Sequence, residues 1–371
     1  MPSRRPHSKS HHGCDQCKQR RIKCDEVHPA CGSCRRKNLA CVFQSVGPVL
    51  TPDPPSLAIA NVPNDRTSFL PIQDLELMHH WHTATVDSLT NAKPLKDVVR
   101  VAMPQEGLRS PFLMHSLLAV AAVHLSRSTP PDRRQKYVEV AMTHHNQSLT
   151  LCTPFVNHIT RQNCHALFAF SSLLPIFVFG SQTSRITPRI LSLADVVETL
   201  KLMRGSASIV RQVKPWIEEG PMHPLLRVGK FHQPRDTQDG RARQLLAKFD
   251  ELERDLPDPL SKEGSGLVHG AHLEALQELH HLFQIYVDTG DSRALMAWPA
   301  LVDASYFDLL QQKQQLAVLV LGLFGLALEI LSEQWWLEGT GQSLVALAVN
   351  NLPPIDRELL MRNSPSIAKQ F

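Results

Sequence analysis

The chain has 371 residues, of which 43% are hydrophobic, 20% are charged and 6% are aromatic. This composition excludes a chain that is disordered throughout, a collagen-like fibre and a coiled-coil fibre, and it allows one or two globular domains. The charge is uneven: residues 1–41 hold ten Lys/Arg and three Asp/Glu, whereas residues 42–371 hold 29 and 32. A basic N-terminal segment joined to a mildly acidic body indicates nucleic-acid binding by that segment.

Six of the eight cysteines lie between residues 14 and 41, in a C-x2-C-x6-C pattern that repeats after seventeen residues. These candidate metal ligands are Cys14, Cys17, Cys24, Cys31, Cys34 and Cys41. The segment 1–10 lacks the apolar core of a signal peptide, so we expect the protein to lie in a reducing compartment. In such a compartment, cysteines that are this closely spaced bind metal more often than they form disulfides. Each half offers three thiolates, and zinc takes four. Six sulfurs therefore complete two zinc sites if two of them bridge.

Four cations separate the second and third cysteines: Lys18, Arg20, Arg21 and Lys23. If residues 14–22 form a short helix, its exposed side carries cations that can enter a major groove and donate to guanine O6 and N7. In the second half, residues 35–37 are also basic. They either approach the phosphate backbone or form a solvated basic face.

The cysteine array, the basic run and Pro29 resemble the fungal Zn2Cys6 binuclear-cluster transcription factors. The resemblance implies two zinc ions, with Cys14 and Cys31 as bridging thiolates and the other four cysteines as terminal ligands. It also implies that Arg20 and Arg21 read a short G/C-rich triplet of double-stranded DNA, and we interpret Lys18 and Lys23 as phosphate contacts. The expected function is zinc-dependent, sequence-specific regulation of RNA polymerase II genes in the nucleus.

Five segments are expected: a basic tail at 1–13, the cysteine domain at 14–43, a linker at 44–71, a body at 72–362 and a polar tail at 363–371. The linker is rich in proline and has no heptad pattern, so it is expected to be an extended spacer rather than a coiled coil. A homodimer must then form through the body, or the protein binds DNA as a monomer. The cations of the first tail are interpreted as phosphate contacts, part of a nuclear-import signal or a solvated tail.

The body shows apolar residues at three- and four-residue intervals, which predicts helices. The expected helices are 74–89, 111–126, 132–151, 160–179, 191–203, 240–256, 269–287, 309–336 and 343–352. We therefore predict an all-α protein: a small zinc cluster with two short helices, and a larger helical domain. The apolar run 316–328 is too short to span a bilayer, so no membrane span is expected.

Stretches of the body are similar to the sterol-uptake-control type of fungal zinc-cluster regulators; they are residues 75–80, 112–120, 163–168, 216–221 and 335–339. This resemblance implies a helical regulatory domain, which in some members is a receptor for a sterol, while many relatives sit beside biosynthetic gene clusters. A possible apolar small-molecule ligand such as a sterol follows from it. The helix at 316–328, with Gly322 and Gly325, is either plain core or the wall of an apolar pocket.

The sequence contains no Gly-rich phosphate loop, GxSxG elbow or HExxH motif, so we do not expect an enzyme. His79 and His82 have a spacing that permits metal binding, but we interpret them as packing or solvated side chains. Cys152 and Cys164 are interpreted as buried small apolar residues. One alternative stays open, a helical interaction protein whose zinc module contacts protein rather than DNA.

Overall fold

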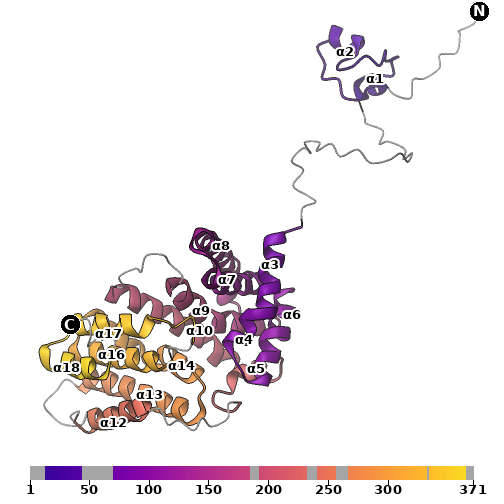
Figure 1. Cartoon of the computed structure of the whole chain (residues 1–371). Coiled ribbons are helices and arrows are strands. Elements are labelled where there is room, and N and C mark those ends of the chain that lie inside the picture. Colours follow the sequence, from indigo (N-terminus) through magenta and orange to yellow (C-terminus); the bar gives the residue numbers. More distant parts are fainter. Residues whose placement is uncertain are drawn as a thin grey trace, which may run out of the picture. The chain divides into compact units, whose positions relative to one another are not determined.

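A computed structural model describes residues 13–43, 70–183, 192–231, 240–255, 266–331 and 334–364. The chain divides into two compact units between Ser68 and Phe69. We call the described residues of the first unit the head (13–43) and those of the second the body (70–364) (Figure 1). Most of the two expected tails and most of the expected linker lie outside the described residues, although Asn363 of the second tail ends α18.

The head contains two short helices, α1 (Asp15–Gln19) and α2 (Gly32–Arg36). Its interior consists of sulfur: five of the six cysteines are buried, and Cys41 is partly buried. The larger aliphatic side chains of the head, such as Ile22 and Val27, are exposed. So small a unit without an apolar core depends on metal binding for its folding free energy.

All regular structure of the body is helical in the described residues, which confirms the all-α prediction. Its first helices are α3 (Ile72–His80), α4 (Val86–Leu89), α5 (Lys93–Asp97), α6 (Met103–Gly107), α7 (Pro111–Ser128), α8 (Pro131–Val156) and α9 (Cys164–Thr183). The π-helical segments η1 (Trp81–Thr85) and η2 (Val98–Ala102) join α3 to α4 and α5 to α6. The remaining helices are α10 (Leu193–Glu218), α11 (His223–Leu226), α12 (Gly240–Asp255), α13 (Gly266–Thr289), α14 (Arg293–Leu301), α15 (Ala304–Gln311), α16 (Gln315–Ile330), α17 (Thr340–Asn351) and α18 (Pro354–Asn363).

The first of two apolar cores in the body surrounds α7. Every residue from Leu117 to Val123 is buried, because apolar and small side chains occupy all sides of the helix there. The partner helix α8 buries only one stripe, which is Ala141, His144, Ser148 and Cys152. This spacing of three and four residues makes α8 the outer helix of a hairpin with α7 (Figure 1).

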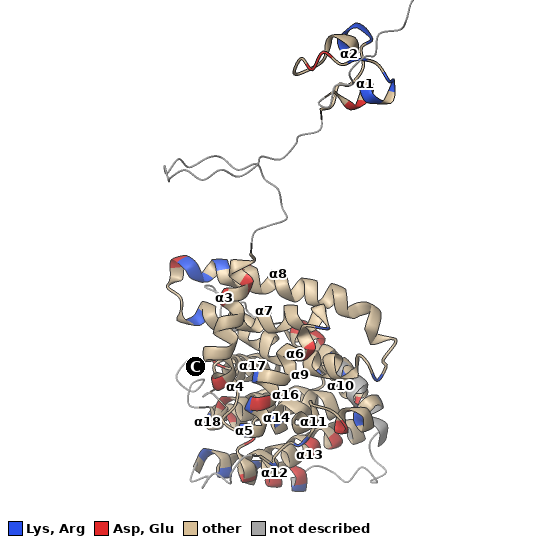
Figure 2. Ribbon diagram, turned by 90° about the vertical axis from the view of Figure 1, so that its right-hand side faces the viewer, with Lys and Arg blue, Asp and Glu red and all other residues tan. Residues whose placement is uncertain are grey.

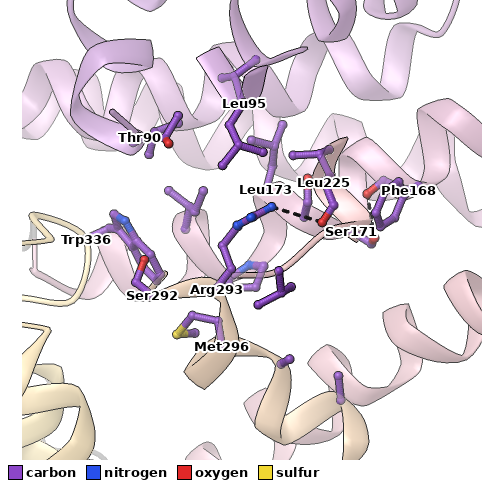
Figure 3. Close-up of a pocket in the computed structure, with 18 of the residues that line it drawn as sticks. Thr90, Leu95, Phe168, Ser171, Leu173, Leu225, Ser292, Arg293, Met296 and Trp336 are labelled. Carbon is purple, nitrogen blue, oxygen red and sulfur yellow. Dashed lines mark hydrogen bonds between the residues drawn. The ribbon is translucent and has the colours of Figure 1, made fainter. Parts of the chain in front are cut away.

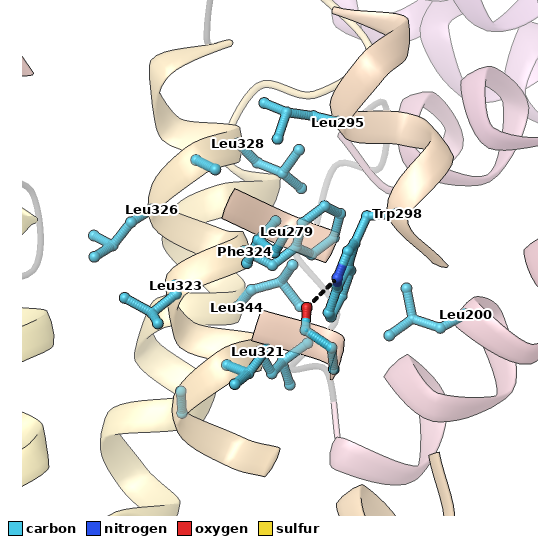
Figure 4. Close-up of a cluster of buried hydrophobic side chains, with 14 of the residues drawn as sticks. Leu200, Leu279, Leu295, Trp298, Leu321, Leu323, Phe324, Leu326, Leu328 and Leu344 are labelled. Carbon is cyan, nitrogen blue, oxygen red and sulfur yellow. Dashed lines mark hydrogen bonds between the residues drawn. The ribbon is translucent and has the colours of Figure 1, made fainter. Parts of the chain in front are cut away.

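The second core surrounds α16, whose residues 317–329 are all buried (Figure 4). Close packing depends on its two glycines: a Cβ at Gly322 would lie 3.0 Å from the Ala348 Cβ, and one at Gly325 would lie 3.0 Å from the Leu344 Cβ. Both neighbours belong to α17. Of the two interpretations of the run 316–328, the structure therefore supports plain core, and the apolar cavity of the body is lined by other helices.

The predicted helix at 309–336 is wrong in extent. The chain turns between α15 and α16, where Lys313 has a φ of 57° and the N–H of Gln314 donates to the Leu309 carbonyl at 3.0 Å. The sequence at this turn is entirely polar and offers nothing to bury. Conversely, the helix predicted to end at residue 203 continues to Glu218.

Among the described helices, α9 alone contains a stretch that is long and apolar enough to cross a membrane, Cys164–Gln182. The bent pair α15–α16 passes the same test only when the two helices are taken together. Within Cys164–Gln182, 72% of the apolar window is buried inside the body. Burial of this degree is typical of a core helix, so length and apolarity alone are weak evidence for a span.

Candidate metal centre and nucleic-acid interface

The two halves of the head repeat in their hydrogen bonds as well as in their spacing. The N–H of Lys18 donates to the Cys14 carbonyl at 3.0 Å, and seventeen residues later the N–H of Arg35 donates to the Cys31 carbonyl at 2.9 Å. Each bond closes the first turn of a short helix, so the second cysteine returns to the side of the first. The two halves therefore present their cysteines in the same way.

Backbone N–H groups also point at the sulfurs. The N–H of Cys14 donates to the Cys24 Sγ at 3.5 Å, and the N–H of Cys31 donates to the Cys41 Sγ at 3.3 Å. These bonds hold the third cysteine of each half beside the first. Hydrogen bonds of this kind stabilise a thiolate, the form that binds metal.

The six sulfurs form two overlapping groups of four, and within each group all Sγ atoms lie within 4.8 Å of one another. The first group is Cys14, Cys17, Cys24 and Cys31, and the second is Cys14, Cys31, Cys34 and Cys41. Two thiols, Cys14 and Cys31, belong to both groups, and their Sγ atoms are 3.7 Å apart. The structure thus brings all six predicted ligands together.

The spacing of the sulfurs can be tested against zinc. A tetrahedral ion with Zn–S bonds of about 2.3 Å separates its ligands by about 3.8 Å. The Sγ of Cys14 is 3.7 Å from that of Cys34, and the Sγ of Cys17 is 3.6 Å from that of Cys31. None of the eight cysteines forms a disulfide. Donor type and spacing therefore both fit zinc.

The pKa values of the two shared thiols, Cys14 and Cys31, are lowered. Burial acts to raise the pKa of Cys31, but the N–H of Cys34 and the adjacent thiols outweigh it and lower the pKa to about 6. Burial is likewise outweighed at Cys14, whose pKa is lowered by hydrogen bonds from Cys17 and other cysteines. Burial and then the neighbouring thiols raise the pKa of Cys34 to about 12. Six close thiols cannot all ionise unless a cation compensates their charge.

The predicted DNA contacts Lys18, Arg20, Arg21 and Lys23 are all exposed. Figure 2 marks the Lys and Arg positions of the head in blue along the ribbon around α1 and α2. The helix is shorter than the expected 14–22, since α1 ends at Gln19 and Arg21 has a φ of 53°. Only Lys18 of the four lies within the helix. Among the described residues, none of the four cations forms an ion pair, so their charges are available to a ligand.

Asp25 is a residue that the sequence analysis missed. Its carboxylate accepts the N–H of Gly32 at 2.9 Å and 3.2 Å, and so caps the start of α2. The equivalent N–H of the first half, that of Asp15, donates instead to the Val42 carbonyl at 2.9 Å. A Cβ at position 32 would lie 2.6 Å from the carboxylate of Asp25, so glycine fits there best. No spacing rule in the sequence marks this pair.

The basic side chains of the second half are exposed too, but one of them is engaged. Arg36 Nε donates to the Gly32 carbonyl at 3.3 Å, which directs this side chain back along α2. Both interpretations of residues 35–37, backbone contact and solvated face, stay open.

The other candidate ligands are isolated. In the described part of the body, no group of three His, Cys, Asp or Glu side chains converges as the cysteines of the head do. His79 and His82 are exposed. Cys152 and Cys164 are buried, as expected, and burial raises the pKa of Cys152 to about 11.

Comparison with known families gives two matches. Residues 12–46 match the fungal Zn(2)-Cys(6) binuclear cluster domain, and residues 76–213 match the fungal specific transcription factor domain. The chain therefore carries both the zinc-cluster domain and the helical domain that are found in the fungal Zn2Cys6 transcription factors. These proteins bind zinc through the cysteine cluster, bind DNA and regulate genes; the family is one of transcription factors rather than enzymes, and its members are in general nuclear.

Two Zn2Cys6 proteins align with most of the chain. The Zn(2)-C6 fungal-type transcription factor afumD of Aspergillus fumigatus is 29% identical over 330 residues, which covers 84% of this chain and 83% of the relative. A Zn(2)-C6 fungal-type transcription factor of Gibberella zeae is 25% identical over 426 residues, which covers 95% of this chain and 84% of the relative.

The resemblance to sterol-uptake-control regulators is confirmed by a third relative. Sterol uptake control protein 2 of Saccharomyces cerevisiae is 26% identical over 281 residues, or 73% of this chain. The match covers 29% of that larger protein, so most of the relative has no counterpart in the alignment.

Proposed function

We propose that the chain is a nuclear, sequence-specific regulator of RNA polymerase II genes whose head holds two zinc ions. The bridging thiolates are Cys14 and Cys31; Cys17 and Cys24 complete one site, and Cys34 and Cys41 complete the other. The observation that carries this proposal is the pair of four-thiol groups that share two sulfurs. Zinc supplies the cross-links and the positive charge that this sulfur-rich interior needs.

In this proposal the head reads DNA with the segment after Cys17. Arg20 and Arg21 contact the bases of a short G/C-rich triplet in the major groove, and Lys18 and Lys23 contact phosphates. Support comes from the exposure of all four cations and from the backbone that carries them: the N–H of Ile22 donates to the Cys17 carbonyl at 3.1 Å. This bond links the segment to a zinc ligand.

The proposed domains are the tail 1–13, the DNA-binding domain 14–43, the linker 44–71, the regulatory body 72–362 and the tail 363–371. A division between Ser68 and Phe69 is compatible with these boundaries. The proline-rich sequence of the linker disfavours a coiled coil, so we propose that a homodimer would form through the body; the alternative is that a monomer binds the DNA.

An apolar ligand such as a sterol is proposed for the body, with sterol or secondary-metabolite genes as targets. The names of the relatives support both possibilities. The Asperfuranone cluster transcription factor afoA of Emericella nidulans is 38% identical over 52 residues, or 13% of this chain.

The test is selection of bound sites from random DNA duplexes by the purified, zinc-loaded chain. We expect enrichment of a G/C-rich triplet, with an affinity that falls steeply as salt rises. Removal of zinc by a chelator should abolish binding while the circular dichroism of the body persists. A head that binds no duplex but captures a protein would support the alternative, an interaction protein with a zinc module.

A further inference from the structure

The turn between α7 and α8 presents a threonine followed by a proline. Thr129 directly follows α7, and Pro130 directly precedes α8. Both residues are extended: φ and ψ are −96° and 140° at Thr129, and −53° and 151° at Pro130. Residues 130–133 are exposed and Thr129 is partly buried. The turn therefore offers an extended Thr-Pro segment to an enzyme from solution.

Thr-Pro and Ser-Pro pairs are the sequences that proline-directed protein kinases phosphorylate. The chain contains six such pairs. The pairs at Thr51 and Thr187 lie outside the described residues. Four acceptor residues can be compared in the structure: Ser110, Thr129, Thr153 and Ser364.

The other three described acceptors are less available than Thr129. The N–H and the carbonyl of Ser110 both form backbone hydrogen bonds at the start of α7, at 3.0 Å and 2.9 Å. Thr153 lies inside α8, where its hydroxyl donates to a carbonyl of the same helix at 2.8 Å. Ser364 is 0% exposed. Of the four, Thr129 alone combines an extended backbone with an exposed turn.

The start of α8 lacks a side-chain cap. The N-cap position is Pro130, which has no polar side chain, and Pro131 is the first residue of the helix. The Thr129 hydroxyl is directed the other way, since it donates to the Leu125 carbonyl at the end of α7 at 2.7 Å. The start of a helix carries partial positive charge and is stabilised by an anion. Asp132 is the acidic residue that the first turn of α8 provides.

Cations gather at this helix start, although the helix dipole disfavours them there. Three lie in the first two turns of α8: Arg133, Arg134 and Lys136 (Figure 2). Neither they nor Asp132 form an ion pair with another described residue. Arg127, on the other side of the turn, pairs with Glu338. Three cations and one carboxylate leave a surplus of two positive charges.

One of these arginines has a buried donor without an acceptor. The Nε of Arg134 is buried and has no hydrogen-bond partner. A buried N–H without an acceptor is unfavourable and therefore uncommon. The N–H groups of Arg133 and Arg134 both donate to the Pro130 carbonyl at 3.0 Å, and side chains at a helix start lean toward its N-terminus. Both side chains thus begin beside the residue that follows Thr129.

We propose that Thr129 is a phosphorylation site for a proline-directed protein kinase, and that the guanidinium groups of Arg133 and Arg134 bind the phosphate at the start of α8. The Thr129 Oγ1 attacks the γ-phosphorus of Mg-ATP. The bond from that phosphorus to the oxygen shared with the β-phosphate breaks, ADP leaves, and the hydroxyl proton passes to an aspartate of the kinase. The phosphate adds a charge of about −1.5 to −2, which matches the surplus at the helix start.

The modification acts on both sides of the turn. It removes the hydroxyl that donates to the Leu125 carbonyl, and it places a negative charge where the end of α7 disfavours one and the start of α8 favours one. Arg127 at the end of α7 pairs with Glu338, and its guanidinium lies 5.9 Å from the centre of the Trp335 ring. A charge added at Thr129 therefore changes the electrostatic surroundings of a contact between α7 and the segment that follows α16.

The proposed site is separate from the apolar cavity of the body. That cavity is lined by residues such as Leu95, Phe168 and Trp336, and none of its described lining residues lies between 125 and 136 (Figure 3). A failure to find a cavity ligand would therefore leave the phosphorylation proposal intact. Selection of duplexes by the head is independent of both.

The first test uses the full-length, zinc-loaded chain, Mg-ATP and a proline-directed kinase that phosphorylates a synthetic peptide of residues 124–136. Mass spectrometry of the digested chain gives the rate at each acceptor, divided by the rate for a peptide of the same sequence. We expect this ratio to be at least about tenfold higher for Thr129 than for Ser110, Thr153 or Ser364. Thr129→Ala should lose the phosphopeptide, and Thr129→Ser should retain it.

Two results would overturn the assignment of Thr129. One is a kinase that modifies the peptide but leaves Thr129 unmodified in the folded chain, or that prefers another of the described acceptors. The other is a peptide that no proline-directed kinase accepts.

The second test identifies the side chains that bind the phosphate. A ³¹P NMR titration of the phosphorylated chain gives the midpoint of the second ionisation of the phosphate, which lies near pH 6 for a free phosphothreonine. Since the arginines favour the dianion, we expect this midpoint at a pH about 0.5 lower than in the phosphorylated peptide. The double variant Arg133→Gln, Arg134→Gln should return it to the value of the peptide, whereas Lys136→Gln, farther along α8, should change it less. An unchanged midpoint in the double variant would show that these arginines do not bind the phosphate.

Discussion

Arg21 and Asn38 lie at the same position in two copies of one turn. Their φ angles are 53° and 51°, and their N–H groups donate to the carbonyls of Lys18 and Arg35 at 3.2 Å and 3.3 Å. Asparagine adopts this left-handed conformation readily, whereas for other residues it costs about 1–2 kcal/mol. The fold therefore gives no reason for an arginine at this turn, whereas the proposed contact of the Arg21 side chain with DNA does.

The substitution Arg21→Asn gives the first half of the head the residue that the second half has at the equivalent position, Asn38. The turn should be retained, while affinity for the selected duplex should fall by about 1–3 kcal/mol and discrimination within the triplet should relax. The measurement is fluorescence anisotropy with matched and mismatched duplexes at several salt concentrations. Arg36→Ala, which removes the same charge from the engaged arginine of α2, is the control and should cost less. If both variants lost the same affinity for matched and mismatched duplexes, Arg21 would contact phosphate rather than bases.

Loss of the cap on α2 should loosen the head. Asp25→Ala removes the acceptor for the Gly32 N–H and should destabilise the zinc-loaded head by about 1 kcal/mol. Asp25→Asn retains an acceptor oxygen and should lose less. Competition for zinc with a chromophoric chelator reports the difference. If the alanine variant holds zinc as tightly as the original chain, the cap has no energetic role.

The convergence of the six thiols follows from spacing, because two short helices with the same hydrogen bonds return each cysteine to one point. The end of α1 and the cap by Asp25 do not follow from spacing, since both depend on contacts made after the chain folds back. In the body, α8 is evident from the three- and four-residue spacing of its buried side chains. The short helix α14 is not, and it contains Pro299. The cavity joins residues from helices far apart in sequence, and no local pattern marks it.

Two glycines of the body allow the effect of close packing to be compared with the effect of backbone flexibility. A Cβ at Gly220 would lie 2.1 Å from the His165 ring, whereas one at Gly205 within α10 would meet nothing within 4 Å. Gly220→Ala should therefore destabilise the body by about 1–3 kcal/mol, and Gly205→Ala should stabilise it by about 0.5–1 kcal/mol. Thermal melting followed by circular dichroism compares them. A melting temperature that does not drop for Gly220→Ala would show that His165 moves aside at little cost.

Acid should weaken the body through the partly buried His145. Burial lowers the pKa of His145 to about 4, and its ring stacks on Phe177 at 3.8 Å between centroids. The unfolded chain, with a histidine pKa of about 6.5, binds the proton first, so this contribution is complete above pH 6.5 and is lost as the pH falls toward 4.

The matching variant is His145→Phe, which keeps an aromatic ring on Phe177 but cannot take up a proton. Urea unfolding at pH 7 and pH 5 should show a smaller loss of stability for the variant than for the original chain. Between pH 7 and pH 8 the two proteins should respond alike. An identical loss on going to pH 5 would mean that His145 is already solvated when the body is folded.

The central claim is that six thiols hold two zinc ions by sharing Cys14 and Cys31, and the most direct test is the zinc count per chain from native mass spectrometry. The original chain should carry two ions. Cys24→Ala leaves the second group of four thiols complete and should keep one ion, whereas Cys14→Ala leaves both groups with three and should impair both sites. A single zinc in the original chain, or the same count for both variants, would contradict the shared arrangement.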